Sequence, residues 1–182
     1  MGRKPDLERR AELLDDVVAY ILDRGIHQTS LRPLANQLGT STYAFVYHFG
    51  SKEQLITCAL DEVAARNQAA LADFGPDGTL ADFVHDYWNW NVDTDELRTA
   101  RIITDARSLV RVRPQLFCPF VERTREDLRV ALSARLESLG MTDDDLQIIL
   151  ATLSGALADL VGFDDSSRGA ATVERLLERV AA

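Results

Sequence analysis

Apolar residues recur at helical spacing through almost the whole chain, and this periodicity limits the fold more than any other feature. One face of a helix is clear near the N-terminus, where apolar side chains fall at i, i+3, i+4, i+7 and i+8: Leu14, Val17, Val18, Ile21 and Leu22. No stretch between turn residues alternates apolar and polar side chains, as a half-buried strand would. The sequence therefore predicts an all-α protein of about nine helices.

The first 50 residues are predicted to form three of these helices. The amphipathic helix is followed by Gly25, and a short helix over residues 31–38, capped by Thr29 or Ser30, ends at Gly39. A second short helix begins after the cap Ser41 and includes Phe45 and Phe49, which are spaced to face inward. Two short helices joined by a glycine turn are typical of a helix-turn-helix, although an ordinary helical hairpin fits the same pattern.

Charge is distributed unevenly along the chain. The net charge is -9, but all of the excess acid lies after residue 58. Between Asp23 and Glu53 there is no acidic residue, whereas Arg32, Lys52 and two histidines lie in or at the end of this interval. A surface that faces phosphates needs such a segment. The charge pattern therefore favours nucleic-acid binding by the N-terminal third.

The run from Ser30 to Leu55 resembles the DNA-binding signature of the tetracycline-repressor-like (TetR) regulators. The matching residues are Thr29-Ser30, Leu34-Ala35, Leu38-Gly39, Ser41, His48-Phe49 and Ser51-Lys52-Glu53 with Leu55. The resemblance implies a three-helix head, a connecting fourth helix and a helical core. It predicts a DNA-binding domain over residues 1–50 and a ligand-binding and dimerisation domain over residues 51–182.

The same resemblance implies roles for individual side chains in the head. Ser30 and Arg32 would reach phosphate and base, and the start of the reading helix would face the major groove with Ser41, Thr42, Tyr43 and Ala44. Phosphates would be held by Tyr47, His48 and Lys52. His48 has a second interpretation, as a buried, hydrogen-bonded histidine at a helix end.

One position departs from the family pattern. The family usually has an aromatic residue, most often tyrosine, where this chain has Val46, and the tyrosine here is one place later, at Tyr47. One helical step is about 100°, so Tyr47 cannot occupy the same place. We expect this protein to anchor the corresponding phosphate differently or not at all.

An aromatic cluster follows in the second part of the chain. The resemblance implies a ligand-binding core there, and the candidate residues are Phe83, Tyr87, Trp88, Asn91, Arg101, Asp105, Phe117 and Phe120. The aromatic residues also keep the spacing of an ordinary core. Arg101 and Asp105, four residues apart, could form an exposed ion pair.

The last two predicted helices carry a stripe of small residues beside a row of large apolar ones. The surface comprises Leu150, Ala151, Ser154, Gly155, Ala158, Val173, Leu176, Leu177 and Val180. Small residues allow a second helix to approach closely, and the family forms a four-helix dimer interface with such a surface. A packing face within one chain is the alternative.

The sequence excludes several other function classes. Its three histidines and two cysteines are scattered, and no glycine-rich phosphate loop or metal-ligand spacing occurs. We therefore expect no enzyme, metal or cofactor, and the lack of a signal peptide or an 18-residue apolar run predicts a cytoplasmic protein without a membrane partner.

The sequence predicts a transcriptional regulator, and specifically a repressor. It would bind a palindromic, double-stranded operator as a homodimer and be released by a small-molecule effector. A ligand-independent regulator of the same fold, or a small helical enzyme, is the alternative.

Overall fold

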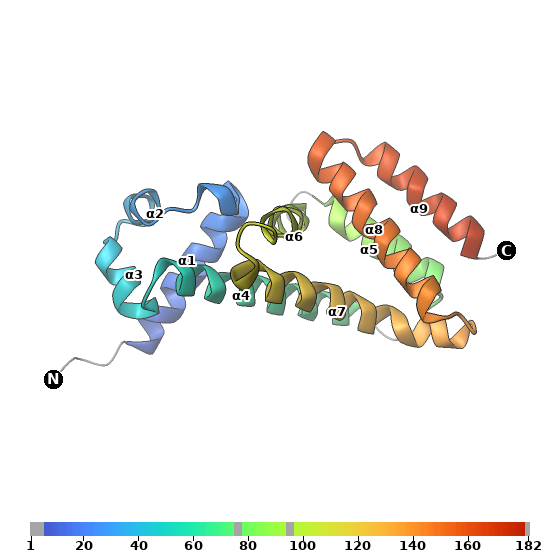
Figure 1. Ribbon diagram of the computed structural model, residues 1–182, viewed down its shortest axis with the longest axis horizontal. Helices are drawn as coiled ribbons and strands as arrows, with labels where there is room; N and C mark the ends of the chain where they lie inside the picture. The colour runs from blue at the N-terminus through green and yellow to red at the C-terminus, as the bar shows by residue number, and fades with distance from the viewer. Residues whose placement is uncertain (1–5, 75–77, 94–96, 181–182) are drawn as a thin grey trace.

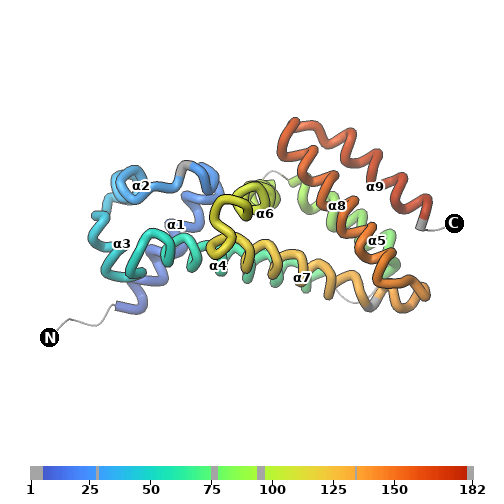
Figure 2. Tube along the Cα trace, viewed as in Figure 1, coloured from blue at the N-terminus to red at the C-terminus, as the bar shows by residue number. Residues whose placement is uncertain are grey.

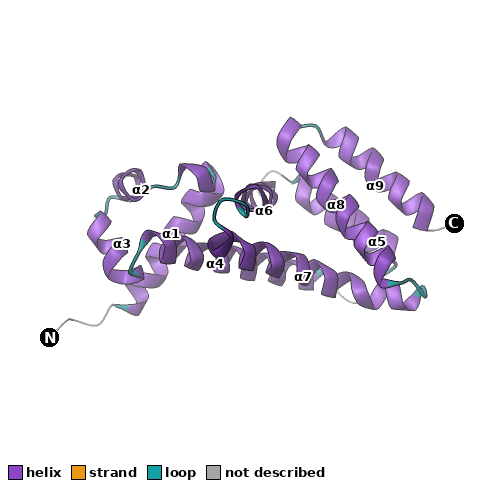
Figure 3. Ribbon diagram, in the orientation of Figure 1, coloured by secondary structure: helices purple, strands orange, loops and turns teal. Residues whose placement is uncertain are grey.

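The computed structural model describes residues 6–74, 78–93 and 97–180, apart from the side chains of Gln28, Ala134 and Val180. Within these ranges the chain forms nine α-helices, one short 3-10 helix and no strand, so the predicted all-α fold is confirmed (Figure 3). The elements in chain order are α1 (Leu7–Arg24), η1 (Ile26–Gln28), α2 (Leu31–Gln37), α3 (Thr42–Phe49), α4 (Lys52–Asp73), α5 (Leu80–Val92), α6 (Leu97–Leu109), α7 (Pro114–Ser138), α8 (Asp143–Phe163) and α9 (Ser166–Val180).

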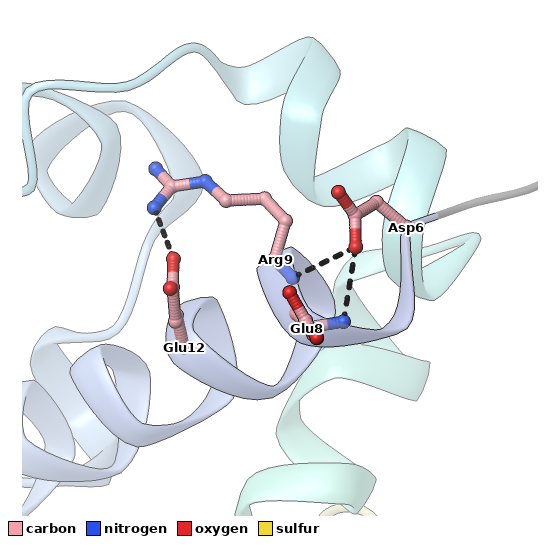
Figure 4. Close-up of polar contacts among 4 residues, drawn as sticks. All are labelled: Asp6, Glu8, Arg9 and Glu12. Atoms are coloured by element: carbon pink, nitrogen blue, oxygen red, sulfur yellow. Dashed lines mark hydrogen bonds and ion pairs between the residues drawn. The ribbon is translucent and has the colours of Figure 1, made fainter.

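Several helices begin at a residue whose side chain caps free backbone N–H groups. At α1 the Asp6 carboxylate accepts hydrogen bonds from the backbone nitrogens of Glu8, at 3.0 Å, and Arg9, at 3.3 Å (Figure 4). At α8 the side chains of Thr142 and Asp145 form a reciprocal capping box. These local contacts explain why the helix starts could be read from short sequence motifs.

The molecule is elongated, with a three-helix head at one end. The helices α1, α2 and α3 form this head, while α5, α8 and α9 gather at the opposite end (Figure 1). Between the two ends α4 and α7 pack along each other. The helix α6 lies between the head and α8 (Figure 2), and it contacts α1, η1, α7 and α8.

The buried side chains form two separate clusters. The first joins the head to the nearer parts of α4, α6 and α7, and includes Ile102 and Phe117. The second joins the far end of α4 to α5, α7, α8 and α9. Along α4 the first cluster ends at Ala64 and the second begins at Leu71. The head is therefore packed into the same core as two helices of the second half of the chain.

Candidate nucleic-acid interface and core cavity

Buried side chains in the head fix how α3 lies. Phe45 and Phe49 of α3 are buried in the first cluster with Leu34 and Ala35 of α2, as their spacing predicted. The turn between the two helices passes through Gly39, whose φ of +59° suits glycine. Because the phenyl rings face inward, the other side of α3 is turned to solvent.

The outer side of α3 is aromatic and uncharged. Tyr43 is 73% exposed and Val46 is 46% exposed, and Tyr47 lies beside them. The rings of Tyr43 and Tyr47 stack with their centroids 6.1 Å apart and their planes at 24°. Since α3 carries no Lys, Arg, Asp or Glu, this surface offers hydroxyl and apolar groups to a partner.

The predicted DNA-contacting side chains are distributed around this surface. Ser30 and Arg32, at the start of α2, are exposed, while Thr42 and Ala44 on α3 are half-buried. Ser41 caps α3, and its hydroxyl oxygen accepts a hydrogen bond from the Ala44 backbone nitrogen at 3.2 Å. The structure therefore brings the start of α2 and the start of α3 to the surface of one compact head.

Lys52 and His48 lie where α3 is followed by α4. Lys52 is the first residue of α4, directly after the cap Ser51. The His48 side chain is half-buried, and its Nδ1 atom is buried without a hydrogen-bond partner among the described residues. The two interpretations of His48, as a phosphate contact and as a buried, hydrogen-bonded histidine, both remain predictions.

Arg10 is a residue of the head that sequence reasoning missed. Its Nε donates a hydrogen bond to the backbone oxygen of His48 at 3.3 Å, and its guanidinium carbon lies 4.9 Å from the centre of the Phe49 ring. Arg10 thus ties the C-terminal end of α3 to α1. No sequence signal indicated this contact, since 38 residues separate the two partners.

A second feature is a small cavity between five helices. Its volume is about 30 Å³, which is room for one or two water molecules. The lining comes from α4 to α8 and consists of Asn67, Tyr87, Ala100, Ile103, Thr104, Arg107, Thr124, Arg125, Leu128, Leu150, Ser154 and Leu157. Of the eight residues predicted to bind a ligand, Tyr87 lines this cavity.

The other predicted ligand residues lie elsewhere in the core or at the surface. Phe83 and Trp88 are buried in the second cluster, and Asn91 is buried with its side-chain nitrogen donating to the Tyr87 backbone oxygen at 2.8 Å. The remaining four lie nearer the head: Phe117 and Phe120 are buried in the first cluster, Arg101 is exposed and Asp105 is half-buried. The structure does not bring the eight together around one cavity.

Burial changes the acidity of three groups in this region. It raises the pKa of the Tyr87 hydroxyl to about 12, so this group is protonated at neutral pH. Burial also lowers the pKa of Arg107. The interaction with Tyr87 raises this pKa, and the charge of nearby Arg125 lowers it further. Burial raises the pKa of Asp105, while His27 and Arg101 act in the opposite direction. Asp105, His27 and Arg101 therefore lie close to one another where α6 passes the head.

Comparison with known proteins identifies the head. Residues 13–57 match the sequence model of the family described as bacterial regulatory proteins, tetR family. The head is a TetR-family domain. No curated protein matches its sequence.

Solved structures share the fold of the chain over nearly its whole length. A transcriptional regulator from Rhodococcus sp. Rha1 is 20% identical with a TM-score of 0.80, and the match covers 94% of this chain and 95% of that one. A TetR transcriptional regulator from Legionella pneumophila is 16% identical with a TM-score of 0.76 and covers 98% and 99%. The regulator FadR from Bacillus subtilis, solved with stearoyl-CoA, is 18% identical with a TM-score of 0.67 and covers 93% and 96%. At these identities the likeness establishes the common fold.

The helix α8 presents an apolar outer side. Ala151, Gly155 and Ala158 of the small-residue stripe are exposed, as are the larger Ile148, at 60%, and Phe163, at 67%. Among the described helices, α8 alone is long and apolar enough to cross a membrane. Of its most apolar 18 residues, 33% are buried within the protein.

The predicted dimer surface is divided by the structure between two environments. Leu150, Val173 and Leu176 are buried within the chain, and Leu177 and Ser154 are half-buried. Ser154 and Leu150 also line the core cavity. The side chain of Val180 lies outside the described part of the chain. Ala151, Gly155 and Ala158 therefore face outward, Ser154 faces the core, and most of the large residues hold α8 and α9 together.

Proposed function

We propose that this TetR-family protein is a sequence-specific, DNA-binding transcriptional regulator of the cytoplasm, a repressor rather than an enzyme. The proposal rests chiefly on the outer side of α3, where exposed Tyr43, Val46 and Tyr47 project from a buried scaffold. Such a surface has no use in the packing of the head itself. The acid-free segment from Arg24 to Lys52 surrounds it, so approach to the DNA backbone meets no repulsion there.

The dimensions of α3 suit the major groove. Its eight residues extend over about 12 Å, and its N-terminal turn carries Thr42, Tyr43 and Ala44 for contact with base edges. These side chains, together with Val46, supply hydroxyl and apolar groups but no bidentate donor or acceptor. Apolar groups recognise the thymine methyl, and hydroxyls accept or donate single hydrogen bonds. We therefore expect thymine-containing steps in each half-site.

Affinity for the DNA backbone would come from the residues around α3. Arg32 and Ser30 are exposed at the start of α2, and Lys52 stands at the start of α4. Tyr47 and His48 lie at the end of α3 toward Lys52. Phosphate contacts from these side chains position the head on the duplex, while the start of α3 reads sequence.

The experiment that tests this function is selection of binding sites from random duplexes, followed by fluorescence anisotropy with the enriched sequence. We expect one enriched, roughly palindromic sequence whose preferences change in Tyr43→Ala. The control Leu139→Ala alters a side chain that is 56% exposed at the end of α7 and should leave binding unchanged. Enrichment of no sequence, at low and moderate salt alike, would contradict the proposal.

The outer side of α8 supports a homodimer. A palindromic operator needs two reading helices related by a two-fold axis, with half-sites about 34 Å apart. The exposed stripe of Ala151, Gly155 and Ala158 lets the same stripe of a second copy approach closely. The residues 51–182 would then supply dimerisation, and the residues 1–50 would supply DNA binding.

Light scattering with size-exclusion chromatography tests the dimer. We expect a dimer for the original protein and a monomer for Gly155→Arg, because an arginine side chain would separate the two stripes. Leu139→Arg, an equally bulky change at the exposed residue that follows α7, should remain a dimer. A monomeric original protein, or a dimer in both variants, would exclude this surface as the interface.

Control by a small-molecule effector completes the proposal. A ligand in the core changes operator occupancy only through a difference in affinity between the two arrangements of the heads. The regulator FadR was solved with stearoyl-CoA, which gives a precedent for ligand binding on this fold. A regulator that needs no ligand is the second candidate, and the small volume of the core cavity is the observation that favours it.

A further inference from the structure

The core cavity is lined by polar and charged side chains as well as apolar ones. The Asn67 side chain, only 6% exposed, is one of the polar residues of this lining. Its amide can donate and accept hydrogen bonds. Asn67 therefore offers a hydrogen-bonding group to a polar ligand in the cavity.

The charge around the cavity is positive. Arg107 is half-buried and forms no ion pair with any carboxylate of the described chain. Arg125, which donates a hydrogen bond to the Gln147 side-chain oxygen, approaches it from α7, and the two cations repel each other. None of the twelve lining residues is acidic. An anion between these groups would remove an uncompensated charge.

Shape and lining narrow the class of anion. A guanidinium presents parallel N–H groups that match the two oxygens of a carboxylate. The lining also includes the apolar side chains of Ile103, Leu128 and Leu157, which suit a hydrocarbon tail. A volume of about 30 Å³ limits the ligand to a few heavy atoms unless the surrounding side chains repack.

The geometry points to a short-chain organic carboxylate, of the size of acetate or propionate, bound with its carboxylate on Arg107 and Asn67 and its tail against the leucines. The further step, that this carboxylate is the effector of the regulator, rests on the proposed function. Arg107 directly follows Ala106 on α6, and Ala106 and Ile102 are fully buried in the cluster that includes the head. A ligand held by Arg107 would thus act on the helix that packs against α1.

Isothermal titration calorimetry of the full-length protein tests the ligand class directly. The probes are acetate and propionate, their neutral isosteres acetamide and propionamide, and inorganic phosphate, all at one ionic strength. We expect saturable binding of a carboxylate at least about ten times tighter than that of its amide or of phosphate. Equal affinity for acid and amide, preference for phosphate, or no carboxylate binding would each overturn the inference.

Variants locate the binding site. Arg107→Met keeps the length of the side chain without its charge and should weaken carboxylate binding at least about tenfold, as should Asn67→Leu. Arg107→Lys, which keeps the charge but not the fork, provides a second measure if the methionine variant fails to fold. Arg123→Met removes an exposed arginine of α7 and should bind as the original protein does. Unchanged affinity in the Arg107 variants would overturn the inference.

Operator binding separates this inference from the proposed function. Anisotropy with the selected operator, with and without propionate, should show weaker DNA binding when propionate is present. If the protein binds its operator but no carboxylate, the inference fails and the proposed function stands. If it binds carboxylate in the calorimeter but no DNA sequence, the cavity assignment stands while the proposed function fails.

Discussion

Replacing Phe45 by alanine tests the orientation of α3, on which the proposed reading surface depends. Phe45 is 1% exposed and is among the largest fully buried side chains of the protein. Truncation of a buried phenylalanine to alanine removes about 3–5 kcal/mol of stability, through lost burial and the cavity left behind. Folded proteins are stable by only about 5–15 kcal/mol, so the change would remove a large share of the total.

The neighbouring Val46 is the matched control. It is 46% exposed on the same helix, and alanine at an exposed helical position changes stability by no more than about 0.5 kcal/mol. At this chain length each 1 kcal/mol lowers the melting temperature by about 2–4 °C. We therefore expect Phe45→Ala to melt roughly 6–20 °C lower than the original protein, and Val46→Ala to melt within about 2 °C of it.

Circular dichroism at 222 nm measures the melting temperatures of both variants. The protein concentration is kept the same, because the melting temperature of an oligomer depends on concentration. The binding affinities should show the reverse pattern at a temperature where both are folded, with Val46→Ala the weaker on the selected operator. If Val46→Ala were the destabilised variant, or if both melted alike, α3 would be rotated and its assigned outer side would be wrong.

Three further changes have defined outcomes. In Gly169→Ala the new Cβ would collide with Cη2 of Trp88. Tryptophan fluorescence should therefore shift, and the free energy of unfolding should fall by roughly 1–3 kcal/mol. In the control Gly162→Ala the new Cβ has no atom within 4 Å, so this variant should not be destabilised. The pKa of Tyr87 is raised from 10.0 in the unfolded chain to about 12 in the folded protein, so the unfolded chain loses this proton first as pH rises. The contribution of Tyr87 to stability should be complete below pH 10 and fall by roughly 2–3 kcal/mol as pH rises to 12. Thermal melts over this pH range measure the loss, and the same loss in Tyr87→Phe would refute the assignment. Lys52→Ala should weaken specific and non-specific DNA alike and reduce the salt slope by roughly 0.9 per phosphate lost, while a change confined to one operator sequence would show that Lys52 reads bases.

Local sequence signals determined the helices and the head. Glycines, capping side chains and apolar spacing act within a few residues, and so Ser41, Thr142 and the inward face of α3 could be predicted before any tertiary contact was known. The family resemblance over residues 29–55 has the same origin, because a helix-turn-helix is stabilised mostly by contacts between residues close in sequence.

The tertiary structure decided what the core offers. Asn67 and Arg107 come from different helices, and only the crossing of α4 and α6 with three others places both on one cavity. The sequence also grouped Phe117 with the aromatic residues of the second part of the chain, whereas it packs with the head. On α8 periodicity could not separate buried Leu150 from exposed Gly155. A helical repeat shows that a face is apolar, but which neighbour covers that face depends on helix offsets and crossing angles, which are set by the packing of the whole chain.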